Sequence, residues 1–316
     1  MIELAAPIAR FIDRAVIRMA RLRLEARVVK ELCSAEVPVS ATEPDFFADL
    51  IKPPDYVDFS GRYDFSCDSP MQGVAPECRH IHGEFHPCDG GWRNRPVIIM
   101  LHGWNGENCY RLLFPLLAHR FRRLGISLLS FQLPCHGQRR APVGPGNDFI
   151  SPDLSAMVQS TRQALADARS LIGWLKQEGC GPIGIWGISL GAWLAGLLAC
   201  NDDRLSWAVL MTPIVRMDRA IQELEFCIPI RRSLDGREIP FKGLNLTDHH
   251  PLMDRHNVLL VEGRYDLFAP PAGVEELCKA WGYPPIERFD HGHITILFSV
   301  KAMTRAIRFV QDRAVK

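Results

Sequence analysis

A serine between two glycines is the clearest chemical signal in the chain. Residues 187–191 read Gly-Ile-Ser-Leu-Gly, directly after the apolar residues 183–186 and directly before a helical apolar segment. A strand, a sharp turn and a helix in this order project the serine oxygen above a sheet. The glycines fit because larger side chains would collide across the turn. We therefore predict Ser189 as a nucleophile; the plainer interpretation is a serine that caps a helix.

A histidine late in the chain could serve as the base for this serine. Residues 290–293 read Asp-His-Gly-His and follow a short predicted strand. We prefer His293, because Gly292 permits a tight turn before it and an apolar helix follows. His291 is the alternative.

A carboxylate is also needed to hold the tautomer of the base. Residues 262–266 read Glu-Gly-Arg-Tyr-Asp after the predicted strand 258–261. Asp266 is the candidate acid, and Glu262 lies nearer the strand end. Serine, aspartate and histidine thus follow one another in the chain order of α/β-hydrolases.

Acyl transfer further requires N–H donors for the oxyanion of a tetrahedral intermediate. The residue after the nucleophile, Leu190, is one candidate donor. The other is Trp104, in the loop where His102 and Gly103 follow the apolar strand 97–101. The Trp104 side chain then either shapes the pocket or belongs to the core.

The elements that would position these residues alternate between short apolar strands and longer helices from about residue 61. This alternation predicts an α/β fold with a mostly parallel sheet, helices on both faces and ligands at the carboxyl ends of the strands. A Ser-Pro pair at 151–152 predicts a helix start, and Pro115 is expected to interrupt or kink the helix around it. The predicted strands are 63–67, 79–86, 97–101, 126–131, 183–186, 207–211, 258–261 and 286–289, and the helices are 108–124, 151–175, 190–200, 273–281 and 294–315.

Together these motifs resemble the α/β-hydrolase superfamily, in its serine hydrolase and esterase branch. The resemblance covers residues 61–316 and rests on residues 102–104 (His-Gly-Trp), 187–191, 263–266 (Gly-Arg-Tyr-Asp) and 292–293 (Gly-His). Residues 134–139 are similar to the P-x-x-G-x-R stretch of dienelactone-hydrolase-like members. The resemblance implies the α/β-hydrolase fold with a small cap inserted around residues 213–252.

Residues 1–60 lie outside this resemblance. Apolar residues recur at helical spacing in residues 1–31, among five arginines, and predict an amphipathic helix. We expect it to pack on the main domain as an arm, followed by an extended segment at 34–60. The alternative is a peripheral contact with an anionic membrane surface or with a partner. The apolar residues are Leu4, Ile8, Phe11, Ile12, Ala15, Met19 and Leu22.

Composition narrows the class of protein. The 316 residues are 47% hydrophobic and carry a formal net charge of +1, which argues against a nucleic-acid partner. No apolar run reaches the ~18 residues of a membrane span. Ten scattered cysteines and the absence of a signal-peptide pattern predict reduced thiols in a cytoplasmic protein.

Two further clusters have competing interpretations. Cys78, His80 and His82 share a strand face but lack C-x-x-C spacing, so we predict no metal site. Arg139 and Arg140 would either bind an acidic substrate group or lie in a solvated loop.

The sequence predicts a serine hydrolase that cleaves a small carboxylic ester or thioester through an acyl-enzyme on Ser189, with no cofactor. One alternative is a membrane-surface lipid esterase or an acyltransferase. Another is a non-catalytic binding protein with the same fold. The sequence does not determine the length of the acyl chain, the leaving group or the oligomeric state.

Overall fold

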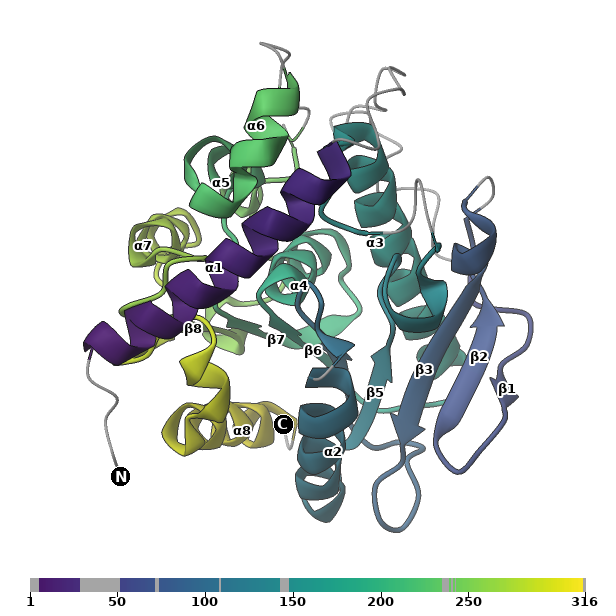
Figure 1. Cartoon of the computed structure of the whole chain (residues 1–316). Helices are drawn as coiled ribbons and strands as arrows, with labels where there is room; N and C mark the ends of the chain where they lie inside the picture. Colours follow the sequence, from purple (N-terminus) through teal and green to yellow (C-terminus); the bar gives the residue numbers. More distant parts are fainter. Residues whose placement is uncertain are drawn as a thin grey trace.

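A nine-stranded sheet forms the centre of the molecule (Figure 1). The structure is a computed structural model, and it describes residues 6–28, 52–71, 74–107, 109–142, 148–234, 239, 241 and 243–314. The strand order is β1-β2-β3-β5-β4-β6-β7-β8-β9. The first three strands pair antiparallel at one edge, and the six from β5 to β9 are parallel. The strands are β1 (Asp58–Phe59), β2 (Asp64–Asp68), β3 (His80–His86), β4 (Val97–Leu101), β5 (Ser127–Phe131), β6 (Ile183–Ile188), β7 (Leu205–Met211), β8 (Val258–Gly263) and β9 (Ile286–Phe289).

Helices cover both faces of this sheet, which explains why its central strands are apolar throughout. Alternate residues of β4 point to opposite faces: Ile98 and Met100 join the core under α2 (Phe114–Arg123) and α8 (Val300–Ala314). Ile99 and Leu101 join the core under α3 (Leu154–Gln177), α4 (Leu190–Asn201) and α7 (Pro271–Ala280). The expected α/β fold class, with a mostly parallel sheet and helices on both faces, is confirmed.

All eight predicted strands are present, with boundaries within two residues of the expected ones. β1 is an additional short strand in the segment expected to be extended. The remaining short elements are η2 (Pro76–Cys78), η3 (Cys109–Leu113), η4 (Gly137–Arg139), η5 (Glu225–Cys227), η6 (Leu246–Asp248), η7 (Arg255–Asn257) and η8 (Thr295–Phe298).

Three predicted helix boundaries are wrong. α3 starts at Leu154, because Asp153 caps it by accepting a bond from Ala156 N at 3.0 Å. Of the two effects expected of Pro115, the structure shows an interruption: the π-helical turn η3 ends before α2, and the proline sits in the first turn of α2, where no N–H is needed. The last helix is preceded by η8, whose Thr295 accepts a bond from Gly292 N at 2.9 Å.

The predicted N-terminal helix is present as α1 (Ala6–Val28), which lies diagonally across the molecule past α6 (Ile228–Leu234) in Figure 1. Its packing face differs from expectation. Phe11 and Met19, expected against the domain, are 71% and 62% exposed, and the fully buried residues include Asp13. Residues 29–51 of the predicted arm lie outside the described part of the chain.

The region expected to form a cap contains two short helices, α5 (Met217–Glu223) and α6, which pack on each other. α6 and η5 also pack against α1. No helix in the described part of the chain is long and apolar enough to cross a bilayer.

A buried ion pair fixes the loop after β5, and it corrects both interpretations of Arg139. The guanidinium is fully buried and donates to Asp167 at 2.6 Å and to Gln132 O at 2.8 Å. Ser69 Oγ donates to the other Asp167 oxygen at 2.6 Å. Arg139 therefore lies neither in solvent nor at a substrate site, and its neighbour Arg140 pairs with Glu107 at 2.7 Å.

Replacing Asp167 with alanine would leave the Arg139 charge buried without its partner. We expect Asp167→Ala to lower the free energy of unfolding by about 3–5 kcal/mol, measured by urea titration. The exposed Asp312→Ala on α8 is the control, with an expected change within about 0.5 kcal/mol. Equal stabilities of the two variants would contradict the role assigned to the pair.

Candidate active site

The predicted nucleophile sits on a strained turn between β6 and α4. Ser189 has φ 55° and ψ −117°, a conformation that L-residues rarely adopt. A Cβ at Gly187 would lie 2.0 Å from Gly191 O, and one at Gly191 would lie 2.3 Å from Leu101 O. The turn therefore requires both glycines, and it directs the serine hydroxyl away from the sheet.

The structure brings Ser189, His293 and Asp266 into one chain of hydrogen bonds. His293 Nδ1–H donates to Asp266 Oδ2 at 2.8 Å, so Nε2 is the acceptor for the Ser189 hydroxyl, also at 2.8 Å. Asp266 Oδ1 accepts from Phe268 N and Ala269 N at 2.8 and 2.7 Å. These bonds fix the carboxylate, which in turn fixes the histidine ring.

Two carboxylates determine the charge preference of His293. Its burial by itself lowers the pKa of the imidazole. The charge of Asp266, its hydrogen bond to the ring and the charge of Asp13 together outweigh this effect, so the pKa lies above its ordinary value of 6.5. The site thus favours the imidazolium that would form when a base takes a proton.

His291 and Glu262, the alternative candidates for the base and the acid, lie outside this chain of hydrogen bonds. His293, and not His291, reaches Ser189; the His291 backbone instead bonds to Phe289 O at 2.8 Å and Tyr265 N at 3.0 Å. Glu262 is buried beside Arg288 at 3.5 Å. Burial raises the pKa of this carboxyl.

The two predicted oxyanion donors border the same space. Leu190 is the first residue of α4, so its N–H has no acceptor within the helix. Trp104 follows Gly103, which packs so close that a Cβ there would lie 3.2 Å from Ser189 Cβ. Both residues line the cavity described below. Their role as donors stays a prediction.

Two buried histidines support the loop of Trp104. His102 Nε2 accepts from Leu133 N at 3.1 Å, and His136 Nε2 accepts from Asn105 N at 3.2 Å. Burial lowers the pKa of His102 to about 3 and that of His136 to about 4. Both rings are therefore neutral and join the loops after β4 and β5. Sequence reasoning gave His136 no role, because its partner lies in another loop.

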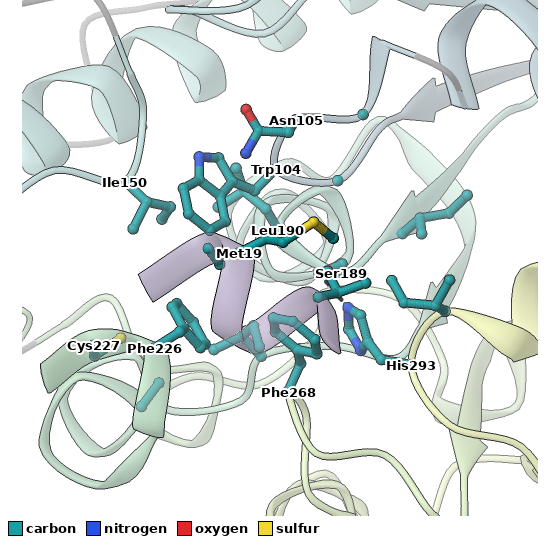
Figure 2. A pocket seen from close by; sticks show the side chains of 18 of the residues that line it. Met19, Trp104, Asn105, Ile150, Ser189, Leu190, Phe226, Cys227, Phe268 and His293 are labelled. Atoms are coloured by element: carbon teal, nitrogen blue, oxygen red, sulfur yellow. Dashed lines mark hydrogen bonds between the residues drawn. The ribbon is translucent and has the colours of Figure 1, made fainter. Parts of the chain in front are cut away.

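A cavity of about 450 Å³ opens above Ser189 and is mostly apolar. Figure 2 shows Ser189 and His293 side by side, with Phe268 next to the histidine. Trp104 stacks on Phe226 with ring centroids 6.0 Å apart and donates its indole N–H to Asp148 at 2.6 Å. The other apolar lining residues include Ile150, Met157, Ile214, Met217, Ile221 and Ile230.

Helix α1 supplies part of the wall of this cavity, through Val16, Met19, Ala20 and Arg23. Sequence reasoning missed this contribution. The helical spacing identified α1 as a helix but carried no signal for the loops it covers. The described residues contain no group of three or more His, Cys, Asp or Glu side chains placed to hold a metal ion.

Comparisons with known proteins agree with this geometry. Residues 98–308 match the model of the alpha/beta hydrolase family. An uncharacterized protein of Mycobacterium tuberculosis is 27% identical over 226 residues, 70% of this chain and 54% of that protein. A thiohydrolase of Aspergillus aculeatus is 27% identical over 128 residues, 40% of this chain and 36% of the relative. The chain thus spans about half the length, or less, of these curated relatives.

Solved structures show the same fold at low sequence identity. An acetyl xylan esterase from Paenibacillus sp. R4 has a TM-score of 0.63 at 17% identity, over 86% of this chain and 96% of that chain. Acetyl xylan esterase 1 from Thermoanaerobacterium sp. has a TM-score of 0.62 at 14% identity, over 92% of this chain and 98% of the other.

The strain at Ser189 predicts a stability effect that is independent of activity. Glycine adopts positive φ without steric cost, so we expect Ser189→Gly to be more stable than Ser189→Ala by about 1 kcal/mol in urea unfolding. Ser206, within strand β7, is the control position; there glycine should be less stable than alanine. The same order at both positions would contradict strain at Ser189.

Proposed function

Because the chain belongs to the alpha/beta hydrolase family, we propose that it is a serine hydrolase that cleaves a carboxylic ester or thioester through an acyl-enzyme on Ser189. The observation that supports this proposal most strongly is the unbroken chain of hydrogen bonds from Asp266 through His293 to Ser189 Oγ. It ends in an apolar cavity large enough for a small substrate.

In the first half-reaction His293 Nε2 takes the proton of Ser189 as Oγ attacks the carbonyl carbon. The N–H groups of Trp104 and Leu190 bind the oxyanion that forms. His293 then gives its proton to the departing alkoxide or thiolate, and the acyl group stays on Ser189. Asp266 stabilises the imidazolium throughout.

In the second half-reaction water attacks the acyl group with His293 as the base, which releases the carboxylic acid. An acceptor alcohol in place of water would make the same acyl-enzyme an acyltransferase. In this proposal α5 and α6 act as the small cap, since Met217, Ile221 and Ile230 line the cavity.

The cavity lining favours a substrate with an apolar acyl or alcohol group, because the side chains around Ser189 are mainly aliphatic and aromatic. Similar proteins named as esterases and as a thiohydrolase support an ester or thioester bond.

Removal of the serine hydroxyl tests the proposal. We expect a fluorophosphonate probe to label the intact protein at Ser189, and Ser189→Ala to abolish labelling and lower ester hydrolysis by about 10⁴-fold or more. Ser206→Ala is the matched control and should behave as the intact protein. A folded intact protein that stays unlabelled and inactive would instead favour the non-catalytic binding protein.

The exposed face of α1 favours a second candidate, a lipid esterase that works at a membrane surface. Phe11, Met19 and Leu22 are more than half exposed, and Met19 also lines the cavity. An apolar stripe of this kind beside basic residues is typical of helices that lie on anionic membranes. The exposed arginines next to the stripe are Arg10, Arg14 and Arg18.

Vesicle binding distinguishes the two candidates. For the lipid esterase we expect co-sedimentation with vesicles that contain anionic lipid, and at least tenfold weaker binding by Phe11→Ser/Met19→Ser, since both lose apolar area that would enter the membrane. The control Tyr283→Ser removes an exposed aromatic residue after α7. Equal sedimentation of all three proteins would remove this candidate.

A further inference from the structure

Helix α1 inserts one charged side chain into the interior of the protein. Its buried face consists of Ala9, Ile17, Leu24 and, between them, Asp13, which is 0% exposed. A carboxylate is expensive to bury without partners, so its contacts indicate why it is there.

The partners of Asp13 are backbone N–H groups of the two loops that carry His293 and Asp266. Asp13 Oδ2 accepts from His293 N at 2.9 Å and from Leu267 N at 3.1 Å. Oδ1 accepts from Ile294 N at 3.2 Å. Three N–H donors thus face the carboxylate, and each favours its ionised form. Burial and the nearby charge of Asp266 act in the opposite direction and raise the pKa of Asp13 above its ordinary value. One side chain thus joins the residue after Asp266 to the candidate base itself.

The local packing admits Asp13 only because the residue before His293 is a glycine. A Cβ at Gly292 would lie 2.7 Å from Asp13 Oδ2. Gly292 therefore allows the carboxylate to reach the N–H groups of His293 and Ile294.

The same helix is tied to the opposite side of the cavity. Arg23 Nε contacts Asp148 Oδ2 at 3.0 Å, and the other oxygen of Asp148 accepts the indole N–H of Trp104 at 2.6 Å. The Asp148 side chain is fully buried. α1 thus bridges the loop of the candidate base and the loop of a candidate oxyanion donor, while its residues between these contacts line the cavity.

We infer that Asp13 is a positioning residue for the base: it holds the backbone of His293 against the loop of Asp266 and keeps α1 in place as a wall of the substrate cavity. This inference rests on the proposed serine hydrolase function for its catalytic consequence, but the contact itself exists independently of it.

The charge of Asp13 adds an electrostatic consequence. The charged side chains that act on His293 in the described chain are Asp266, from the loop between β8 and α7, and Asp13, from α1. Both raise the pKa of His293 against the effect of burial. Removal of one negative charge should therefore lower this pKa, so the ring would lose its proton at lower pH.

The test compares Asp13→Asn, which keeps the shape but removes the charge, with the intact protein. Two quantities are measured: the pH midpoint of His293 by NMR of the ring nitrogens, and the fluorophosphonate labelling rate of Ser189 at neutral pH. We expect a lower midpoint and a labelling rate reduced about tenfold or more, because a base that is held less firmly takes the proton of Ser189 less well.

Two further variants complete the test. Gly292→Ala leaves Asp13 in the chain but blocks its approach, so it should also slow labelling. Glu25→Gln removes a charge from the same helix at its half-buried pair with Arg21 and should leave both quantities unchanged. Thermal unfolding accompanies each measurement, since a purely structural role would lower the Tm without moving the His293 midpoint.

The results separate this inference from the proposed function. An unchanged midpoint and an unchanged labelling rate in Asp13→Asn and Gly292→Ala would overturn the inference. If the intact protein were unlabelled while Asp13→Asn still lowered the midpoint, the contact would stand and the serine hydrolase function would fall.

Discussion

The hydrogen bonds on the two sides of the His293 ring place the strictest constraint on the structure. They require the ends of β6, β8 and β9 to bring Ser189 Oγ and Asp266 Oδ2 each to 2.8 Å from a nitrogen of the His293 ring. Parallel strands meet this requirement, because their carboxyl ends share one edge of the sheet. The strained turn at Ser189 and the tight packing of Gly187 and Gly191 are the local cost of presenting the hydroxyl to the ring.

Residues outside the sheet also hold the site together. They do so through buried charged side chains that pair with an opposite charge or accept from backbone N–H groups. Arg139 and Asp167 fix the loop after β5, which carries His136 and thereby holds the loop of Trp104. Asp13 on α1 fixes the loop of His293. Each of these groups would be unfavourable in the interior alone, and each joins segments far apart in the sequence. The cavity wall therefore depends on polar contacts as much as on its apolar lining.

The sequence predicted those features that depend on residues close together in the chain. Ser189, Asp266 and His293 each follow a predicted short strand, so strand ends and neighbouring glycines located them, and the Gly-x-Ser-x-Gly pattern identified the turn. Asp13 was assigned only to a basic helix, because its partners lie about 250 residues or more away in the chain. Arg139 was wrongly placed for the same reason: a buried ion pair with Asp167 has no local pattern. The predicted packing face of α1 was wrong. The apolar spacing marked a stripe that contains Phe11 and Met19, and the structure exposes both side chains.

The pH dependence of Ser189 labelling by a fluorophosphonate tests the central claim most directly. The His293 ring must be neutral to take the serine proton, and its pKa lies above 6.5. Labelling should therefore be lost as the pH falls through a single midpoint above 6.5, and Asp266→Asn should lower the plateau rate by about 10⁴-fold. A rate that is constant between about pH 5 and about pH 9 would contradict activation of Ser189 by His293 and Asp266. A midpoint below 6.5 would contradict the raised pKa of His293.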